Sequence, residues 1–197
     1  MRNYNPTVLA LILVFFASNC MAEEDEYTYA QIWNTKYKIP AAYDASSSGS
    51  SIGFNATLDT FKPYRTGRGW NNRILVLVTK SYARKGSHIW ESHHAESLRN
   101  NYKRHQFVET KRIKNTMTKY VTGAGEDIYV PDQDMEVMPI GFIECTRATE
   151  IFIDPSCRHY FIKQNQAWKI TFGSQHLPEY AKIRKRTETF VSRFEVK

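Results

Sequence analysis

The sequence lacks the residue arrangements that carry chemistry in enzymes. It has no paired carboxylates, no Cys/His set and no Ser/His/Asp set at a catalytic spacing. Residues 49–53 (GSSIG) match the G-x-S-x-G pattern of serine esterases around Ser51, but that motif needs a buried strand that turns into a helix. Here a serine-rich polar loop precedes the serine and a strand-like stretch follows it. We therefore predict no catalytic residue and no enzyme; a hydrolase that uses Ser51 is the enzymatic alternative.

Metal-binding and phosphate-binding patterns are also missing. His88, His93 and His94 lie around Trp90, but their spacing does not bring three imidazoles to one face of a helix, and no nearby cysteine or carboxylate completes a zinc set. The glycine pairs at 67–69 and 123–125 lack the strand-then-helix setting of a phosphate loop and predict turns. The sequence predicts no metal and no cofactor.

No apolar run is long enough to span a membrane. The run at residues 8–17 (VLALILVFFA) follows Arg2 and precedes small residues, which is the layout of a secretory signal peptide. We predict that residues 1–22 form this peptide and that cleavage before Glu23 leaves a soluble periplasmic protein. Lipidation of Cys20 is the alternative, because the preceding residues loosely match a bacterial lipobox, and only then do we expect membrane attachment.

Cysteine is scarce, with three residues in 197. Removal of the first 22 residues leaves 175, enough for a single domain (23–197) with its own core, and leaves only Cys145 and Cys157. In an exported chain, two cysteines twelve positions apart beside strand-like runs predict one disulfide formed in an oxidising compartment. Two free thiols are the alternative.

Positive charge dominates. The whole chain carries a net charge of +7, and loss of Arg2 with the signal peptide leaves +6. Four acids are bunched at residues 23–26, so the rest of the mature chain is more basic still. Such a balance favours an acidic partner: anionic lipid, an acidic protein surface or nucleic acid. Export excludes nucleic acid from the expected partners.

Most of the chain shows short apolar patterns typical of strands. Residues 51–61, 74–78, 128–130 and 137–144 are strand-like, and residues 107–121 predict a basic strand or strand pair. The more polar stretch at 23–50 predicts an arm and a surface loop, parts of which can dock through Tyr27, Tyr29, Ile32 and Trp33. A mostly exposed helix is predicted at 91–107. No linker divides the chain.

The C-terminal third has the clearest pattern. Trp168, Ile170 and Phe172 alternate with less apolar residues, which predicts a half-buried strand. After Pro178, the apolar side chains recur with helical spacing and leave most of the basic ones on the opposite face; they are Tyr180, Ile183, Thr187, Phe190 and Phe194. We predict an α+β fold, in which an antiparallel sheet is packed by this amphipathic C-terminal helix and by one or two other helices.

Basic and aromatic side chains are interleaved in the segment 80–104. Aromatic anchors among cations are typical of protein contact surfaces, although a solvated charged face has the same composition. The candidate partner-binding residues are Tyr82, Arg84, Lys85, His88, Trp90, His93, His94, Tyr102, Lys103 and Arg104.

The C-terminal region also carries a recognisable pattern. It comprises Ile143-Glu144-Cys145, Ser156-Cys157-Arg158, Tyr160-Phe161, the strand at 168–172, residues 177–183 (LPEYAKI) and residues 190–194 (FVSRF). This pattern resembles the tail of periplasmic immunity proteins that bind lipase effectors of type VI secretion. The resemblance implies a non-enzymatic inhibitor that docks on a phospholipase toxin, including the phospholipase D type, and blocks access to its active site. The alternative is an envelope protein that binds anionic lipid or polysaccharide through a basic face.

Overall fold

The computed structural model describes residues 27–64, 69–80, 107–114, 116–123, 125–132, 141–150 and 153–196. The predicted signal peptide, with Cys20, lies outside these ranges, and so does the predicted helix at 91–107 except for Phe107.

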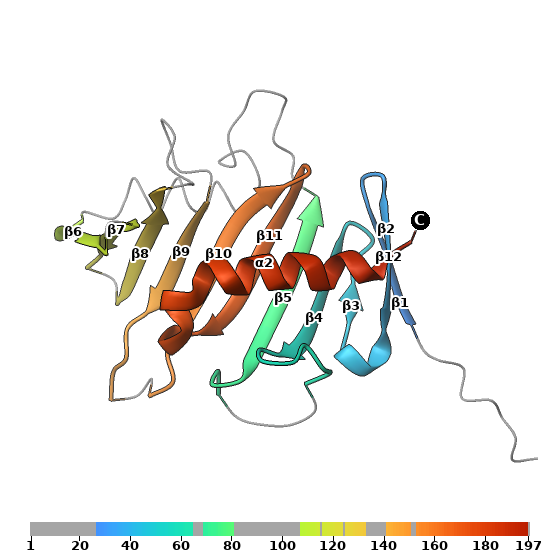
Figure 1. Cartoon of the computed structure of the whole chain (residues 1–197), viewed down its shortest axis with the longest axis horizontal. Helices are drawn as coiled ribbons and strands as arrows, with labels where there is room; N and C mark the ends of the chain where they lie inside the picture. The colour runs from blue at the N-terminus through green and yellow to red at the C-terminus, as the bar shows by residue number, and fades with distance from the viewer. Residues whose placement is uncertain are drawn as a thin grey trace, which may run out of the picture.

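An antiparallel sheet of nine strands forms the main layer (Figure 1). Its spatial order is β3-β4-β5-β11-β10-β9-β8-β7-β6, so that the C-terminal hairpin β10–β11 lies between strands from the first and middle parts of the chain. The strands are β3 (Ser46–Ser47), β4 (Ser51–Thr57), β5 (Arg73–Lys80), β6 (Glu109–Ile113), β7 (Met117–Val121), β8 (Glu126–Pro131), β9 (Gly141–Thr146), β10 (Ser156–Lys163) and β11 (Gln166–Gly173).

The sequence predicted several of these strands, and the structure confirms them: alternation predicted β4, and a short apolar run predicted β5. The basic stretch at 107–121 forms the antiparallel pair β6–β7, and the strand-like residues 128–130 lie in β8. In β11 the predicted inward residues Trp168, Ile170 and Phe172 are buried, but Ala167 and Thr171 on the other face are buried too. The expectation of a half-buried strand is therefore wrong, because β11 lies between β5 and β10 and these small side chains are flanked on both sides.

A second sheet of three strands joins the first two strands of the described chain to the last one. It has the order β1-β2-β12 and comprises β1 (Tyr27–Ile32), β2 (Thr35–Pro40) and β12 (Glu195–Val196). The β1–β2 hairpin corrects the expectation of an arm and loop at 23–50. Ile32, Tyr37 and Ile39 face the core, and the Tyr37 hydroxyl lies 2.9 Å from the Gln166 side-chain oxygen of β11. Docking on the main sheet therefore stabilises a hairpin whose own apolar content is small.

Helix α2 (Tyr180–Val191) crosses one face of the main sheet, from β10 towards β4 and the three-stranded sheet (Figure 1). Its buried residues are Tyr180, Ile183, Thr187, Phe190 and Val191, which confirms four residues of the predicted stripe. The fifth, Phe194, lies beyond α2 in the 3-10 turn η6 and packs against the core only in part. Pro178 belongs to the preceding 3-10 segment η5 (Ser174–Glu179) rather than to the first turn of α2.

The expected additional helices are not found in the part of the chain that the structure describes. Apart from α2, its helical segments are short 3-10 turns: η2 (Ala41–Tyr43), η5 and η6 (Ser192–Phe194). The main core lies between the sheet and α2, and a smaller cluster of Ile128, Val130 and Phe142 lies on the other face of the sheet. The fold is thus α+β, dominated by antiparallel strands.

Candidate partner-binding surface

All ten predicted partner-binding residues, Tyr82 to Arg104, lie within the range 81–106, which the structure does not describe. Their role stays a prediction. A candidate surface must therefore be sought on the described strands and on α2.

The outward face of the three-stranded sheet gathers aromatic and basic side chains. Side chains alternate along a strand. Ala30 and Ile32 of β1 are buried, as are Tyr37 and Ile39 of β2, so the alternate residues of both strands face outward. We call this surface the outer hairpin face; it comprises Tyr27, Tyr29, Trp33, Lys36, Lys38 and Val196. Three of the five large hydrophobic side chains that are exposed in the described residues, Tyr29, Trp33 and Val196, belong to it.

Lys38 lies between the two tyrosines of this face. It is directly opposite Tyr29 in the β1–β2 register, and its Nζ is 3.9 Å from the ring centroid of Tyr27 and 5.9 Å from that of Tyr29. The cation is therefore held over aromatic rings. Tyr29 is nevertheless 61% exposed, so a large part of its ring is accessible to another molecule.

Trp33 is held at the tip of the hairpin. Its backbone has a φ of 54°, its indole N–H donates to the Asn165 carbonyl at 3.0 Å, and the Nζ of Lys80 lies 5.6 Å from its ring. These contacts orient a ring that is still 44% exposed. A pre-oriented aromatic beside cations is the type of residue that carries binding energy at protein interfaces.

A second polar cluster lies on the sheet face away from α2. The Arg158 guanidinium is 3.1 Å from Glu144 and 3.7 Å from Glu126. Burial, together with the hydrogen bond and the charge of Glu144, raises the pKa of Glu126 to about 7, although Arg158 acts in the opposite direction. The Tyr160 hydroxyl also donates to Glu144, at 3.4 Å. Together these contacts form a partly buried ion-pair network, to which we assign no catalytic role.

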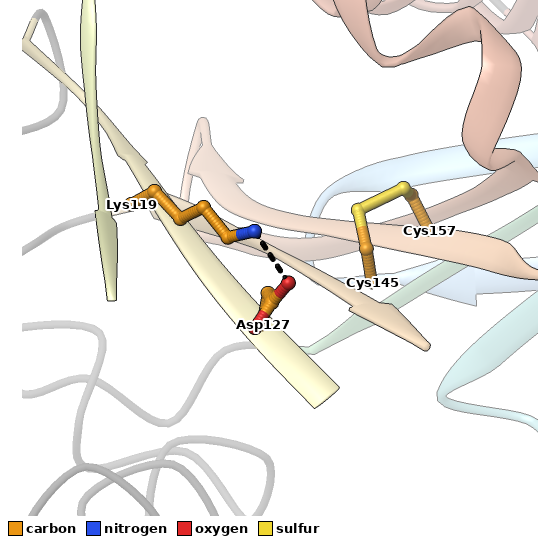
Figure 2. The surroundings of a disulfide bond; sticks show 4 residues. All are labelled: Lys119, Asp127, Cys145 and Cys157. Atoms are coloured by element: carbon orange, nitrogen blue, oxygen red, sulfur yellow. Dashed lines mark ion pairs between the residues drawn. A yellow bond between two sulfur atoms is a disulfide. The ribbon is translucent and has the colours of Figure 1, made fainter. Parts of the chain in front are cut away.

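The disulfide predicted from the sequence is present: Cys145 and Cys157 are bonded (Figure 2). Asp127 lies opposite Cys145 on β8 and is paired with Lys119 at 2.7 Å and with Arg147 at 2.8 Å. Burial would raise the pKa of Asp127, but hydrogen bonds from these two cations outweigh it and lower the pKa. This satisfied buried charge is part of the framework rather than of a binding site.

The structure does not give Ser51 the setting of a catalytic serine, and His88, His93 and His94 lie outside the described residues. Ser51 begins strand β4, and its hydroxyl lies 2.5 Å from that of Ser48; the serine therefore starts a strand instead of turning into a helix. Across the described ranges, no three His, Cys, Asp or Glu side chains are grouped as a metal site requires. None of the described helices combines the length and the apolar character needed to cross a membrane.

The chain matches no protein-family model, and it has no match among curated proteins. Its structure is similar to that of Smlt3025, an immunity protein of the Stenotrophomonas maltophilia type IV secretion system, with a TM-score of 0.57. The two chains are 15% identical, and the likeness covers 88% of this chain and 94% of that one. A likeness at this identity shows a shared fold over nearly the whole of both chains.

Proposed function

We propose that this protein is a periplasmic immunity protein, which binds a toxin delivered by a bacterial secretion system and blocks access to its active site. The observation that carries the proposal is the likeness to Smlt3025, which extends over nearly the whole of both chains. An internal disulfide fits an oxidising compartment, and the outer hairpin face has the composition of a contact surface. On this proposal the protein acts by binding and has no catalytic activity of its own.

For the toxin, we propose a phospholipase effector of a type VI secretion system, including the phospholipase D type. This choice rests on the C-terminal pattern around Cys145, Cys157 and residues 177–194, whereas Smlt3025 is described for a type IV system. The class of toxin and the class of secretion system therefore need separate tests.

The decisive experiment uses the mature chain, residues 23–197, and the toxin encoded beside it. The purified proteins should form a complex of defined stoichiometry, and lipid hydrolysis by the toxin should stop near an equimolar ratio. A toxin that binds but has another activity would contradict only the lipase assignment. Absence of a complex, together with salt-sensitive binding to anionic vesicles or polysaccharide, would instead favour an envelope protein with a basic face.

Two sets of variants locate the contact surface. Tyr29→Ala and Lys38→Glu on the outer hairpin face should each weaken toxin binding by roughly tenfold or more, as expected for an aromatic anchor and its cation. Lys111→Ala on the edge strand β6 is the control and should change the affinity less than about twofold. Trp90→Ala and Tyr102→Ala test the predicted patch in the same assay.

A further inference from the structure

A basic groove lies between the C-terminal half of α2 and the turn after β4. It has a volume of about 310 Å³. Lys185, Arg186 and Arg193 supply cations to its wall, Thr60 and Thr189 supply hydroxyls, and the rings of Phe61 and Phe190 are its aromatic lining. No acidic side chain is among the residues that line it.

The cations of this groove have no carboxylate partner in the described part of the chain. The two acids of this helical region are engaged elsewhere: Glu188 pairs with Arg184 and Lys163, and Glu179 pairs with Lys182. Because both carboxylates are already paired with other cations, the positive charge of the groove is not neutralised by them. This charge favours an anionic ligand.

Aromatic contacts hold two of the guanidinium groups in place. Arg186 lies 5.0 Å from the ring centroid of Phe61 and donates to the backbone carbonyl of Asp59, and Arg193 lies 6.0 Å from the ring of Phe190. A planar guanidinium fixed in this way keeps donors for a carboxylate and loses less entropy on binding it.

We propose that this groove binds an acidic segment of the partner protein, with Asp or Glu carboxylates on Lys185, Arg186 and Arg193. The proposal that the partner is a toxin rests on the proposed function; the chemistry of the groove does not. Arg193 lies in η6, which directly precedes β12, and Val196 of β12 belongs to the outer hairpin face, so the groove and that face are only three residues apart in the chain. A concave site lined by both cations and aromatic rings suits a projecting peptide segment better than a flat lipid surface.

The first test uses a fluorescein-labelled peptide of glutamates as the probe and needs no toxin. The Lys185→Glu/Arg193→Glu variant should bind it at least about tenfold more weakly than the wild type, with most of the wild-type binding lost at high salt. Both substituted residues are exposed, so the variant should fold. Lys111→Glu/Lys182→Glu is the matched control: it makes the same change in net charge at exposed positions outside the groove and should weaken binding less than about threefold.

Equal losses in the two double variants would overturn the inference, because binding would then follow net charge alone. Vesicles that contain phosphatidylglycerol form the second arm. If the groove variant loses vesicle binding but keeps peptide binding, the site recognises lipid phosphate and the inference is wrong.

The third arm repeats the comparison with the cognate toxin. A tenfold loss of affinity confined to the groove variant supports the inference, whereas equal affinity of both double variants removes the groove from the interface and leaves the immunity function intact. If the wild type binds the peptide through the groove but binds no toxin, the proposed function fails and the acidic-segment site stands.

Discussion

Cys145 lies directly opposite Cys157 in the β9–β10 pairing, with the two Cα atoms 4.0 Å apart and the sulfurs bonded (Figure 2). The bond therefore links two neighbouring strands in the interior of the nine-stranded sheet. It ties the β6–β9 part of the sheet to the C-terminal hairpin on which α2 packs. Both cysteines are buried on the same side as the main core, which shields the bond from solvent.

Replacement of both cysteines, as Cys145→Ala/Cys157→Ala, should lower the free energy of unfolding by about 3 kcal/mol, because the unfolded chain regains the freedom that the bridge removes. The melting temperature should fall by roughly 6–12 °C. Thermal melts with and without a reductant measure both quantities, and the wild type under reductant should approach the variant. If the wild type and the variant melt at the same temperature without a reductant, the bridge does not form.

Phe190→Ala tests whether α2 seals the core. The Phe190 ring lies 4.9 Å from that of Phe61 and 6.0 Å from that of Phe54, so its removal leaves a cavity among aromatic rings. We expect a loss of about 3–5 kcal/mol in denaturant titrations. The exposed Lys182→Ala is the control on the same helix, with an expected change within about 0.5 kcal/mol. A loss below about 1 kcal/mol for Phe190→Ala would mean that the helix does not close the core.

His159 should make the protein sensitive to acid. It is fully buried between Phe161 and Tyr180, and burial, with the charge of Arg184, lowers its pKa to about 3. Below its ordinary pKa of 6.5 the unfolded chain takes up a proton that the folded chain does not, so stability is lost as the pH falls from about 6.5 towards about 3.

His159→Leu removes this proton uptake. Neither ring nitrogen of His159 has a hydrogen-bond partner in the structure, so the apolar side chain should leave stability near neutral pH unchanged or higher. Between about pH 7.5 and about pH 4.5, the variant should lose about 2–3 kcal/mol less than the wild type in denaturant titrations. Parallel pH profiles for the two proteins would contradict the burial of a neutral histidine.

Glu126 should act with the opposite sign. Its pKa is raised to about 7 by burial and by Glu144, so the folded state keeps a proton that the unfolded chain has already released. Stability is therefore lost as the pH rises from about 4.5 to about 7. Glu126→Gln cannot release this proton, so its free energy of unfolding should not fall over this range. Between about pH 4.5 and about pH 8, the variant should therefore lose about 1–2 kcal/mol less stability than the wild type, a value that allows for screening by solvent at a partly exposed site.

Denaturant titrations at the two pH values measure the effect of Glu126→Gln. Glu109→Gln, at an exposed position on β6, controls for the loss of one carboxylate. An equal response of the two variants would show that the neighbourhood of Glu144 and Arg158 does not perturb Glu126.

Local patterns in the sequence were sufficient to predict much of the fold. The stripe of Tyr180, Ile183, Thr187 and Phe190 predicts α2, and alternation predicts the strands β4 and β11. Both signals come from backbone geometry, which repeats every 3.6 residues in a helix and every two in a strand. The cysteine spacing, with the expectation of export, likewise predicted the disulfide.

The candidate surfaces could not be found in this way. The tyrosines and lysines of the outer hairpin face alternate with Ile32, Tyr37 and Ile39, but the stretch is short and polar, and the hairpin depends on contacts such as the one between Tyr37 and Gln166. The groove brings Phe61 beside Phe190, which is far from it in the sequence. Periodicity reports which side of a strand or helix is apolar, whereas the exposure of a cation or a ring depends on which distant segment packs beside it. The sequence by itself therefore determined α2, several strands of the main sheet and the disulfide, whereas only the tertiary structure decided the β1–β2 hairpin and which side chains form a surface for a partner.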